Sequence, residues 1–241
     1  MSDPSESPVH AVRSAGFALL EPPGLAAVSG VSLATLKGWT PLWEDLPRDG
    51  YLKDGGAYRA RRHSCFVHTL QGGDVEQVAH RAHWQSEDYN ALHGGMERWF
   101  EPLLPALAND PAFLSLLRGL GNAFAQVQPV ERWFIEAHQF RIDTAEGIGR
   151  PTPEGAHRDG VDFVAVILVQ RSNIRGGETR VFDAHGPTGW RFEMQEPWTA
   201  LLLDDAHVIH ESTPIRPVDP AVPGARDTLV LTFRKDGFQA P

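Results

Sequence analysis

The chain has 241 residues, a formal charge of −9 at pH 7 and one cysteine, Cys65. Hydrophobic residues make up 41% and charged residues 22%, so we expect an ordinary globular protein with one domain, residues 1–241. The negative charge disfavours nucleic acid and anionic membranes as partners, and one cysteine excludes an internal disulfide or a zinc site built on thiolates.

Targeting signals are absent from the sequence pattern. Residues 1–7 lack the basic start and apolar stretch of a signal peptide. No apolar run approaches the roughly 20 residues that a membrane helix needs. We therefore expect a cytoplasmic protein.

The first half, residues 1–128, predicts a mostly helical part. Gly16–Leu20 is typical of a short strand, and Val31–Trp39 predicts a short helix. Apolar residues at helical spacing predict longer helices over Glu87–Leu107 and Pro111–Phe124.

The second half, residues 129–241, has a different pattern. Short apolar segments alternate with stretches rich in Gly, Pro, Asn and Asp, which favours a β-sandwich or closed barrel. The predicted strands are Trp133–Ile142, Val161–Gln170, Thr179–Asp183, Trp190–Phe192, Ala200–Leu203 and Thr228–Phe233. The fold class is therefore α+β, mainly β, with helices of the first half packed on a β-barrel core.

A histidine and a carboxylate lie two residues apart in Glu-Gly-Ala-His-Arg-Asp-Gly. On an extended segment His157 and Asp159 project to the same side and can reach one ion. Such a pair alone is also common in surface loops. A second donor group follows about 50 residues later, where a buried strand leads to His207 and His210.

Two neutral imidazoles and one carboxylate form the facial triad of non-haem Fe(II) oxygenases, which leaves coordination positions open. A dicarboxylate cosubstrate then also needs a cation for its far carboxylate. Arg226 and Thr228 occupy one face of a predicted strand and meet that need.

The ordered set His157-x-Asp159, His210 and Arg226-x-Thr228 resembles the 2-oxoglutarate/Fe(II)-dependent dioxygenases with a double-stranded β-helix (jelly-roll or cupin-like) core. The wording of residues 154–163 and 210–215 is similar to the bacterial branch of free L-isoleucine and other aliphatic amino-acid hydroxylases. The resemblance covers about residues 129–233.

The resemblance implies particular roles. Fe(II) would be held by His157, Asp159 and His210, and 2-oxoglutarate by Arg226 with Thr228. O₂ would be the second cosubstrate.

Two alternatives stay open beside these assignments. His207 competes with His210 as the second imidazole ligand. Arg234, at the other end of the last strand, competes with Arg226 for the cosubstrate.

One strand face offers candidate substrate contacts. Gln139 and Arg141 share a face of the predicted strand before the motif, where Arg141 would bind a substrate carboxylate or the oxo-acid if that face lines the barrel. A solvent-facing sheet edge is the alternative.

The remaining histidines carry no ligand pattern. His80 and His83 would share a helix face, but no carboxylate at ligand spacing completes a site, and we expect a structural or exposed role for both. The same expectation applies to His63, His68, His93 and His185.

We therefore expect a dioxygenase that hydroxylates a small molecule, with a free aliphatic L-amino acid as the leading substrate and succinate and CO₂ as coproducts. The alternatives are the same chemistry on a peptide, a carrier-bound amino acid or an alkylated base. A zinc hydrolase, or a non-catalytic jelly-roll module that binds a small carboxylate, would be a different class.

Overall fold

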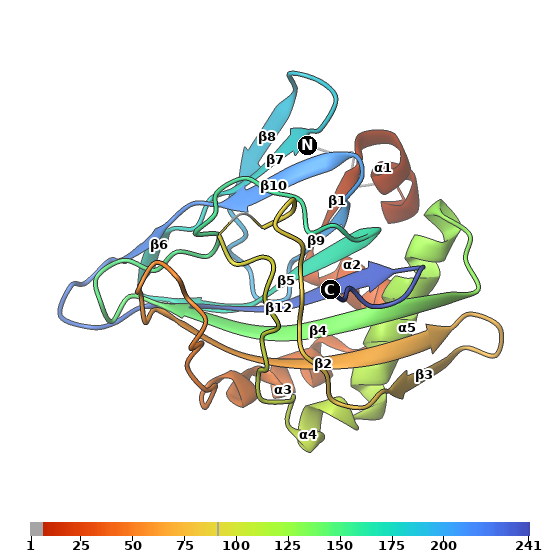
Figure 1. Cartoon of the computed structure of the whole chain (residues 1–241), viewed down its shortest axis with the longest axis horizontal. Coiled ribbons are helices and arrows are strands. Elements are labelled where there is room, and N and C mark those ends of the chain that lie inside the picture. The colour runs from red at the N-terminus through yellow and green to blue at the C-terminus, as the bar shows by residue number, and fades with distance from the viewer. Residues whose placement is uncertain (1–6, 91) are drawn as a thin grey trace.

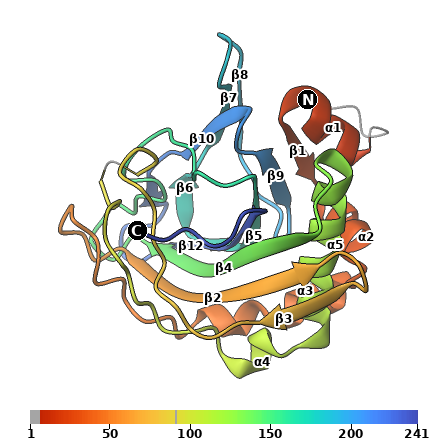
Figure 2. The same cartoon turned by 45° about the vertical axis from the view of Figure 1, so that its right-hand side comes forward.

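The computed structural model describes residues 7–90 and 92–241. A large curved sheet forms the centre of the molecule, with helices against its outer face and smaller sheets over its inner face (Figures 1 and 2). Within the described ranges, every helix is too short or too polar to cross a lipid bilayer.

The large sheet is antiparallel and has the order β1-β9-β5-β12-β4-β2-β3. Its longest members are β2 (Arg59–Thr69), β4 (Arg132–Asp143), β5 (Phe163–Ser172) and β12 (Ala225–Arg234). The shorter strands are β1 (Phe17–Leu20), β3 (Asp74–Gln77) and β9 (Ala200–Asp204).

Two smaller sheets complete the β-structure. One has the order β10-β7-β8 and contains β7 (Thr179–Asp183), β8 (Gly189–Phe192) and β10 (Val208–Ser212). The other pairs β6 (Ile174–Gly176) with β11 (Ile215–Pro217). Figure 2 shows β7 and β10 facing β4 and β12 of the large sheet.

The helices cover the outer face of the large sheet. They are α1 (Pro8–Ala15), α2 (Pro22–Ser29), α3 (Leu33–Gly38), η1 (Thr40–Trp43), α4 (Pro105–Ala108) and α5 (Pro111–Val127). The α5 helix begins at its N-cap Asp110, which accepts a hydrogen bond from Ala112 N, and buries Phe113, Leu117 and Leu120 against the sheet. This apolar layer orients the sheet so that its other face is available for a site.

Most of the predicted elements are present in the structure. The strands predicted in the second half correspond to β4, β5, β7, β8, β9 and β12, and the helix at Pro111–Phe124 corresponds to α5. The prediction of a mainly β protein with flanking helices is confirmed.

The helix predicted over Glu87–Leu107 is wrong. Among the described residues of that range, only the start of α4, from Pro105, is helical. Gly95 has a positive φ of 72°, and its N–H donates to Gln85 O instead of continuing a helix. The segment then returns to pair His83 with Arg98 in an isolated antiparallel bridge.

The first half is also less helical than predicted. Strand β2 lies between β3 and β4 in the large sheet, and β1 pairs with β9 at its other edge. The division at residues 128 and 129 therefore does not separate a helical part from a β-barrel part.

Candidate metal and cosubstrate site

A cavity lies between the inner face of the large sheet and the segment that joins β4 to β5. Its lining includes His157, Asp159 and His210 together with Arg226 and Thr228. Five residues singled out by the sequence motifs therefore border one space.

Backbone pairing brings the two histidines together. His157 N donates to His210 O and His210 N donates to His157 O, each at 3.0 Å. The two rings lie 4.7 Å apart, centroid to centroid. Asp159 Oδ1 lies 3.5 Å from His157 Nε2, and Asp159 Oδ2 lies 3.8 Å from His210 Nε2. One ligand atom from each side chain thus lies within 4.8 Å of the others.

The loop that carries Asp159 is held by a second carboxylate. Asp205 accepts hydrogen bonds from the N–H groups of Asp159, Gly160 and Val161 at 2.9, 2.8 and 3.2 Å. Gly160 has a φ of 75°, and a Cβ there would lie 2.4 Å from the Tyr89 ring. The turn after Asp159 therefore requires glycine.

The side-chain hydrogen bonds leave metal-binding atoms free. His157 Nδ1 donates to Gly155 O at 3.0 Å, so Nε2 is the ring nitrogen that faces Asp159 and is left for a metal. Gln85 Nε2 donates to Asp159 Oδ1 at 3.3 Å and orients the carboxylate.

The charges of the group respond to burial and to one another. Burial alone would lower the pKa of His157, but the hydrogen bond and charge of Asp159 and the charge of Glu154 raise it to about 10. Burial would raise the pKa of Asp159, but His157 and His210 hold it well below its ordinary value. Burial, together with the charge of His157, lowers the pKa of His210 to about 4. Without a metal, a protonated His157 is therefore the counter-ion of Asp159, and a divalent cation would replace that proton.

The donor set fits a non-haem iron ion. Two imidazole nitrogens and one carboxylate oxygen converge from one side, as a facial triad requires. The alternative ligand His207 lies away from these atoms: its side chain is 63% exposed and forms an ion pair with Asp204 at 2.8 Å.

Arg226 is a buried cation with which none of the described carboxylates forms an ion pair. Its residue is 5% exposed, and its Nη2 has no hydrogen-bond partner within the described residues. Burial, reinforced by the charge of Arg171, lowers its pKa to about 10. Thr228, 3% exposed, lines the same cavity two residues along the strand. An anionic ligand at this end of the cavity would supply the missing charge.

Arg234 lies at the opposite end of β12. It borders a smaller neighbouring pocket and donates from Nη1 to Gly237 O at 3.3 Å. The large cavity is not lined by Arg234.

The prediction that Gln139 and Arg141 face the cavity is wrong. Arg141 binds Asp227 through two hydrogen bonds of 2.8 and 2.7 Å, and Gln139 donates to Leu42 O. The alternation along β4 was correct, but the inward positions are His138, Phe140 and Ile142. Asp227 on the neighbouring strand supplies a buried carboxylate, and this stabilises Arg141 on the other face.

Several cavity residues were missed from the sequence. They are Arg59 and Arg61 on β2, Arg98 and Gln85 on the segment before α4, and Glu154 before the first motif histidine. One signal was available, because the alternation Arg59-x-Arg61-x-His63 has the period of two residues that is typical of one strand face. Charged residues at these positions, however, predict an exposed face and not a buried one.

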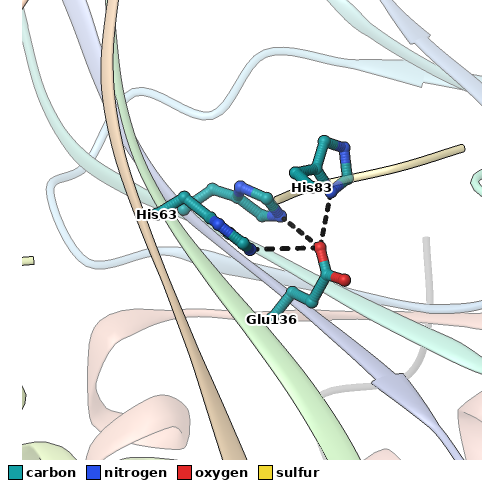
Figure 3. Close-up of side chains that lie close together, drawn as sticks. His63, His83 and Glu136 are labelled. Carbon is teal, nitrogen blue, oxygen red and sulfur yellow. Dashed lines mark hydrogen bonds and ion pairs between the residues drawn. The ribbon is translucent and has the colours of Figure 1, made fainter. Parts of the chain in front are cut away.

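A second group of histidines surrounds one carboxylate oxygen (Figure 3). Glu136 Oε2 lies 2.5 Å from His83 Nδ1, 3.2 Å from His63 Nε2 and 3.5 Å from His138 Nε2. No carboxylate lies at ligand spacing from His83 in the sequence, and the partner Glu136 comes instead from the distant strand β4. These four residues also have the spacing of a metal site.

Hydrogen bonding favours a carboxylate cage over a second metal centre. Arg61 Nη2 donates to His138 Nδ1 at 2.6 Å, and a guanidinium has no acceptor atoms. His138 Nδ1 must then carry the lone pair, so its Nε2 carries the proton and donates to Glu136. Burial alone would raise the pKa of Glu136, but the three histidines hold it well below its ordinary value. The cluster is a charged carboxylate with imidazole donors.

Comparisons with known proteins identify the family of the chain. The sequence model of the family described as "2OG-Fe dioxygenase" matches residues 40–232. The chain is 24% identical over 184 residues to L-isoleucine-4-hydroxylase of Bacillus thuringiensis, which covers 74% of this chain and 75% of that protein. It is 26% identical over 158 residues to 3(1)-hydroxy-L-isoleucine 4-dioxygenase of Pantoea ananatis, and the match spans 63% of each chain.

One solved structure is much more similar. The crystal structure of a bsmA homolog from Methylobium petroleophilum is 59% identical, with a TM-score of 0.93 and coverage of 97% of this chain and 94% of that one.

Proposed function

Because the chain belongs to the 2OG-Fe dioxygenase family, we propose that it hydroxylates a free aliphatic L-amino acid and releases succinate and CO₂. The family membership makes it an oxidoreductase that uses Fe(II), 2-oxoglutarate and O₂. The amino-acid substrate is inferred from relatives that act on isoleucine or its hydroxy derivative, at 24% and 26% identity.

In the proposed site His157, Asp159 and His210 hold Fe(II). The observation that supports the proposal is the convergence of their ligand atoms, within 4.8 Å of one another, in a cavity that Arg226 also lines. Bound Fe(II) supplies the redox chemistry that couples oxidative decarboxylation of 2-oxoglutarate to oxidation of a C–H bond.

The chain itself positions the reactants. Arg226 binds the far carboxylate of 2-oxoglutarate through its guanidinium, and the Thr228 hydroxyl donates to the same group. Gln85 and the N–H groups bound to Asp205 keep the Asp159 carboxylate aimed at the metal. Apolar side chains of Val166, Val230 and Phe140 line the same cavity.

The fold proposed for this function is a double-stranded β-helix. The face-to-face arrangement of the large sheet and the β10-β7-β8 sheet supports a jelly roll, and all the strands belong to one proposed domain, residues 1–241.

A coupled assay tests the proposal. Fe(II)-loaded protein is given 2-oxoglutarate in air with each free L-amino acid in turn, and succinate and product mass are followed. We expect one or more aliphatic amino acids to stimulate succinate release and to gain one oxygen atom. If 2-oxoglutarate is turned over but no amino acid stimulates the reaction, the proposed substrate is wrong. If 2-oxoglutarate does not bind the metal-loaded protein, the proposed site is wrong.

A further inference from the structure

Four arginines line the cavity, and they divide into two places. Arg226 lies on β12. The other three are Arg59 and Arg61 on β2 and Arg98 on the segment between β3 and α4. All four are buried, with exposed fractions between 2% and 6%. Arg226 is assigned to 2-oxoglutarate, whereas no ligand is yet assigned to the other three arginines.

Two members of that group already have partners. Arg59 Nε donates to Asp49 at 2.7 Å in a buried ion pair. Arg61 lies between the rings of Phe100 and Phe140, with its Cζ 3.8 and 4.3 Å from their centroids, and donates to His138. These contacts hold both guanidinium groups in the wall of the cavity.

Arg98 is different because none of the described carboxylates forms an ion pair with it. Its Nη2 donates to the neutral amide oxygen of Gln85 at 2.9 Å, and its Nε has no hydrogen-bond partner among the described residues. The residue is 2% exposed. Burial and the charge of Arg59 lower its pKa to about 10. A buried guanidinium in this state favours an anion from solution.

Gln85 connects Arg98 to the candidate metal ligand. Its Oε1 accepts hydrogen bonds from Arg98 and from Asn90 Nδ2, so its Nε2 is the end that donates to Asp159. An anion bound by Arg98 would therefore lie one amide side chain away from Asp159. A short carbon chain attached to that anion would reach the metal side of the cavity.

A carboxylate with one oxygen that accepts no hydrogen bond from the described residues lines the same cavity. Glu154 Oε2 is buried without a hydrogen-bond partner in the described part of the chain, while Oε1 lies 3.6 Å from His157 Nε2. Glu154 and Arg98 both line this cavity. Among the described residues, the cavity wall thus offers a guanidinium without an ion pair and a carboxylate oxygen without a hydrogen bond.

We propose that Arg98 binds the α-carboxylate of a free amino acid and Glu154 its α-ammonium group, so that the substrate lies as a zwitterion beside the metal site. This inference rests on the proposed function and assigns to Arg98 the role that the sequence suggested for Arg141. An internal residue of a peptide, or an amino acid bound to a carrier through its carboxyl group, has no free α-carboxylate and would give Arg98 no such partner.

Binding measurements without O₂ test the proposal, because they do not depend on turnover. L-isoleucine, L-leucine and L-valine are titrated by calorimetry into protein loaded with Fe(II) and 2-oxoglutarate. For the amino acid that binds, its α-amide (no carboxylate) and its des-amino acid (no ammonium) are titrated as well. We expect each analogue to bind at least about 30-fold more weakly than the amino acid, which corresponds to about 2 kcal/mol.

The variants then assign each charge. Arg98→Gln should weaken amino-acid binding at least about 30-fold and remove the preference over the amide, while 2-oxoglutarate binding stays within about threefold. Glu154→Gln should remove the preference over the des-amino acid. Arg98→Lys keeps the charge but not the planar donors and should lie between wild type and Arg98→Gln, which covers the case of an unstable glutamine variant. Arg132→Gln, at an exposed start of β4, is the matched control and should bind all ligands as wild type does.

The outcomes separate this inference from the proposed function. If 2-oxoglutarate binds and no free amino acid does, the proposed substrate and the zwitterion inference are both wrong, and the metal site stands. If Arg98→Gln binds the amino acid as tightly as wild type, only the zwitterion inference is wrong. If 2-oxoglutarate itself fails to bind the Fe(II)-loaded wild type, the proposed site fails first.

Discussion

Replacing Arg226 should selectively remove affinity for the far carboxylate of 2-oxoglutarate. The pKa of this buried guanidinium is lowered from 12.5 to about 10, chiefly by burial. At about 1.4 kcal/mol per tenfold change in equilibrium, this lowering corresponds to about 3 kcal/mol that a bound carboxylate can restore. Arg226→Gln should therefore weaken 2-oxoglutarate binding by about 100-fold, within the range measured when a buried charge partner is truncated.

The assay is calorimetric titration of 2-oxoglutarate into Fe(II)-loaded protein without O₂. Pyruvate, which lacks the far carboxylate, should bind the wild type and Arg226→Gln within about threefold of each other, because it never contacts Arg226. Thr228→Val should cost about 1 kcal/mol, the net contribution of one hydrogen bond.

Arg234→Gln is the matched control, because it removes the competing arginine from the same strand. Its guanidinium donates to Gly237 O outside the large cavity, and we expect wild-type affinity for 2-oxoglutarate. If Arg234→Gln loses affinity for 2-oxoglutarate and Arg226→Gln keeps it, the far carboxylate of the cosubstrate does not bind Arg226.

The histidines provide three further predictions. His210→Ala should abolish Fe(II) retention after desalting in a folded protein, whereas His207→Ala, which changes an exposed side chain, should retain iron; the reverse result would exchange their roles. The pKa of metal-free His157 is raised to about 10, so Fe(II) binding at pH 8 should release about one proton. Calorimetry in two buffers of different ionisation enthalpy measures that release. Equal binding heats in the two buffers would contradict the prediction. Burial lowers the pKa of His83 from 6.5 to about 4. Between these two pH values the unfolded chain binds a proton at His83 and the folded chain does not. The free energy of unfolding should therefore fall by about 1.4 kcal/mol for each pH unit of acidification in this range. In urea titrations at several pH values His83→Gln should remove that part of the slope, and the exposed His185→Gln should not.

Local patterns were sufficient for much of the fold and for the candidate iron ligands. Helix α5 and strands β5 and β7 have clear apolar patterns and turn residues at their ends. The motif around His157 and Asp159 could be read directly, because its ligands lie two residues apart on one segment. The prediction that His210 belongs with them depended on resemblance, since its proximity comes from pairing across 53 residues of sequence.

The parts that sequence reasoning missed depend on long-range partners. Strand β2 was not recognised because its inward positions are Arg59, Arg61 and His63, which are stable inside only beside Asp49, His138 and Glu136 from other segments. The face of Arg141 was misjudged for the same reason, because its partner Asp227 comes from the neighbouring strand β12. The glycine pair at Gly94 and Gly95 was the available signal against the long helix.

The most direct test of the central claim is a reaction in isotopically labelled O₂, with 2-oxoglutarate and the amino acid that stimulates turnover. We predict one labelled atom in the hydroxylated amino acid and one in succinate, formed in equal amounts, with both products absent for His157→Ala, Asp159→Ala and His210→Ala. A product without the label, or label incorporation that survives these substitutions, would contradict the assignment of iron-dependent amino-acid hydroxylation to this site.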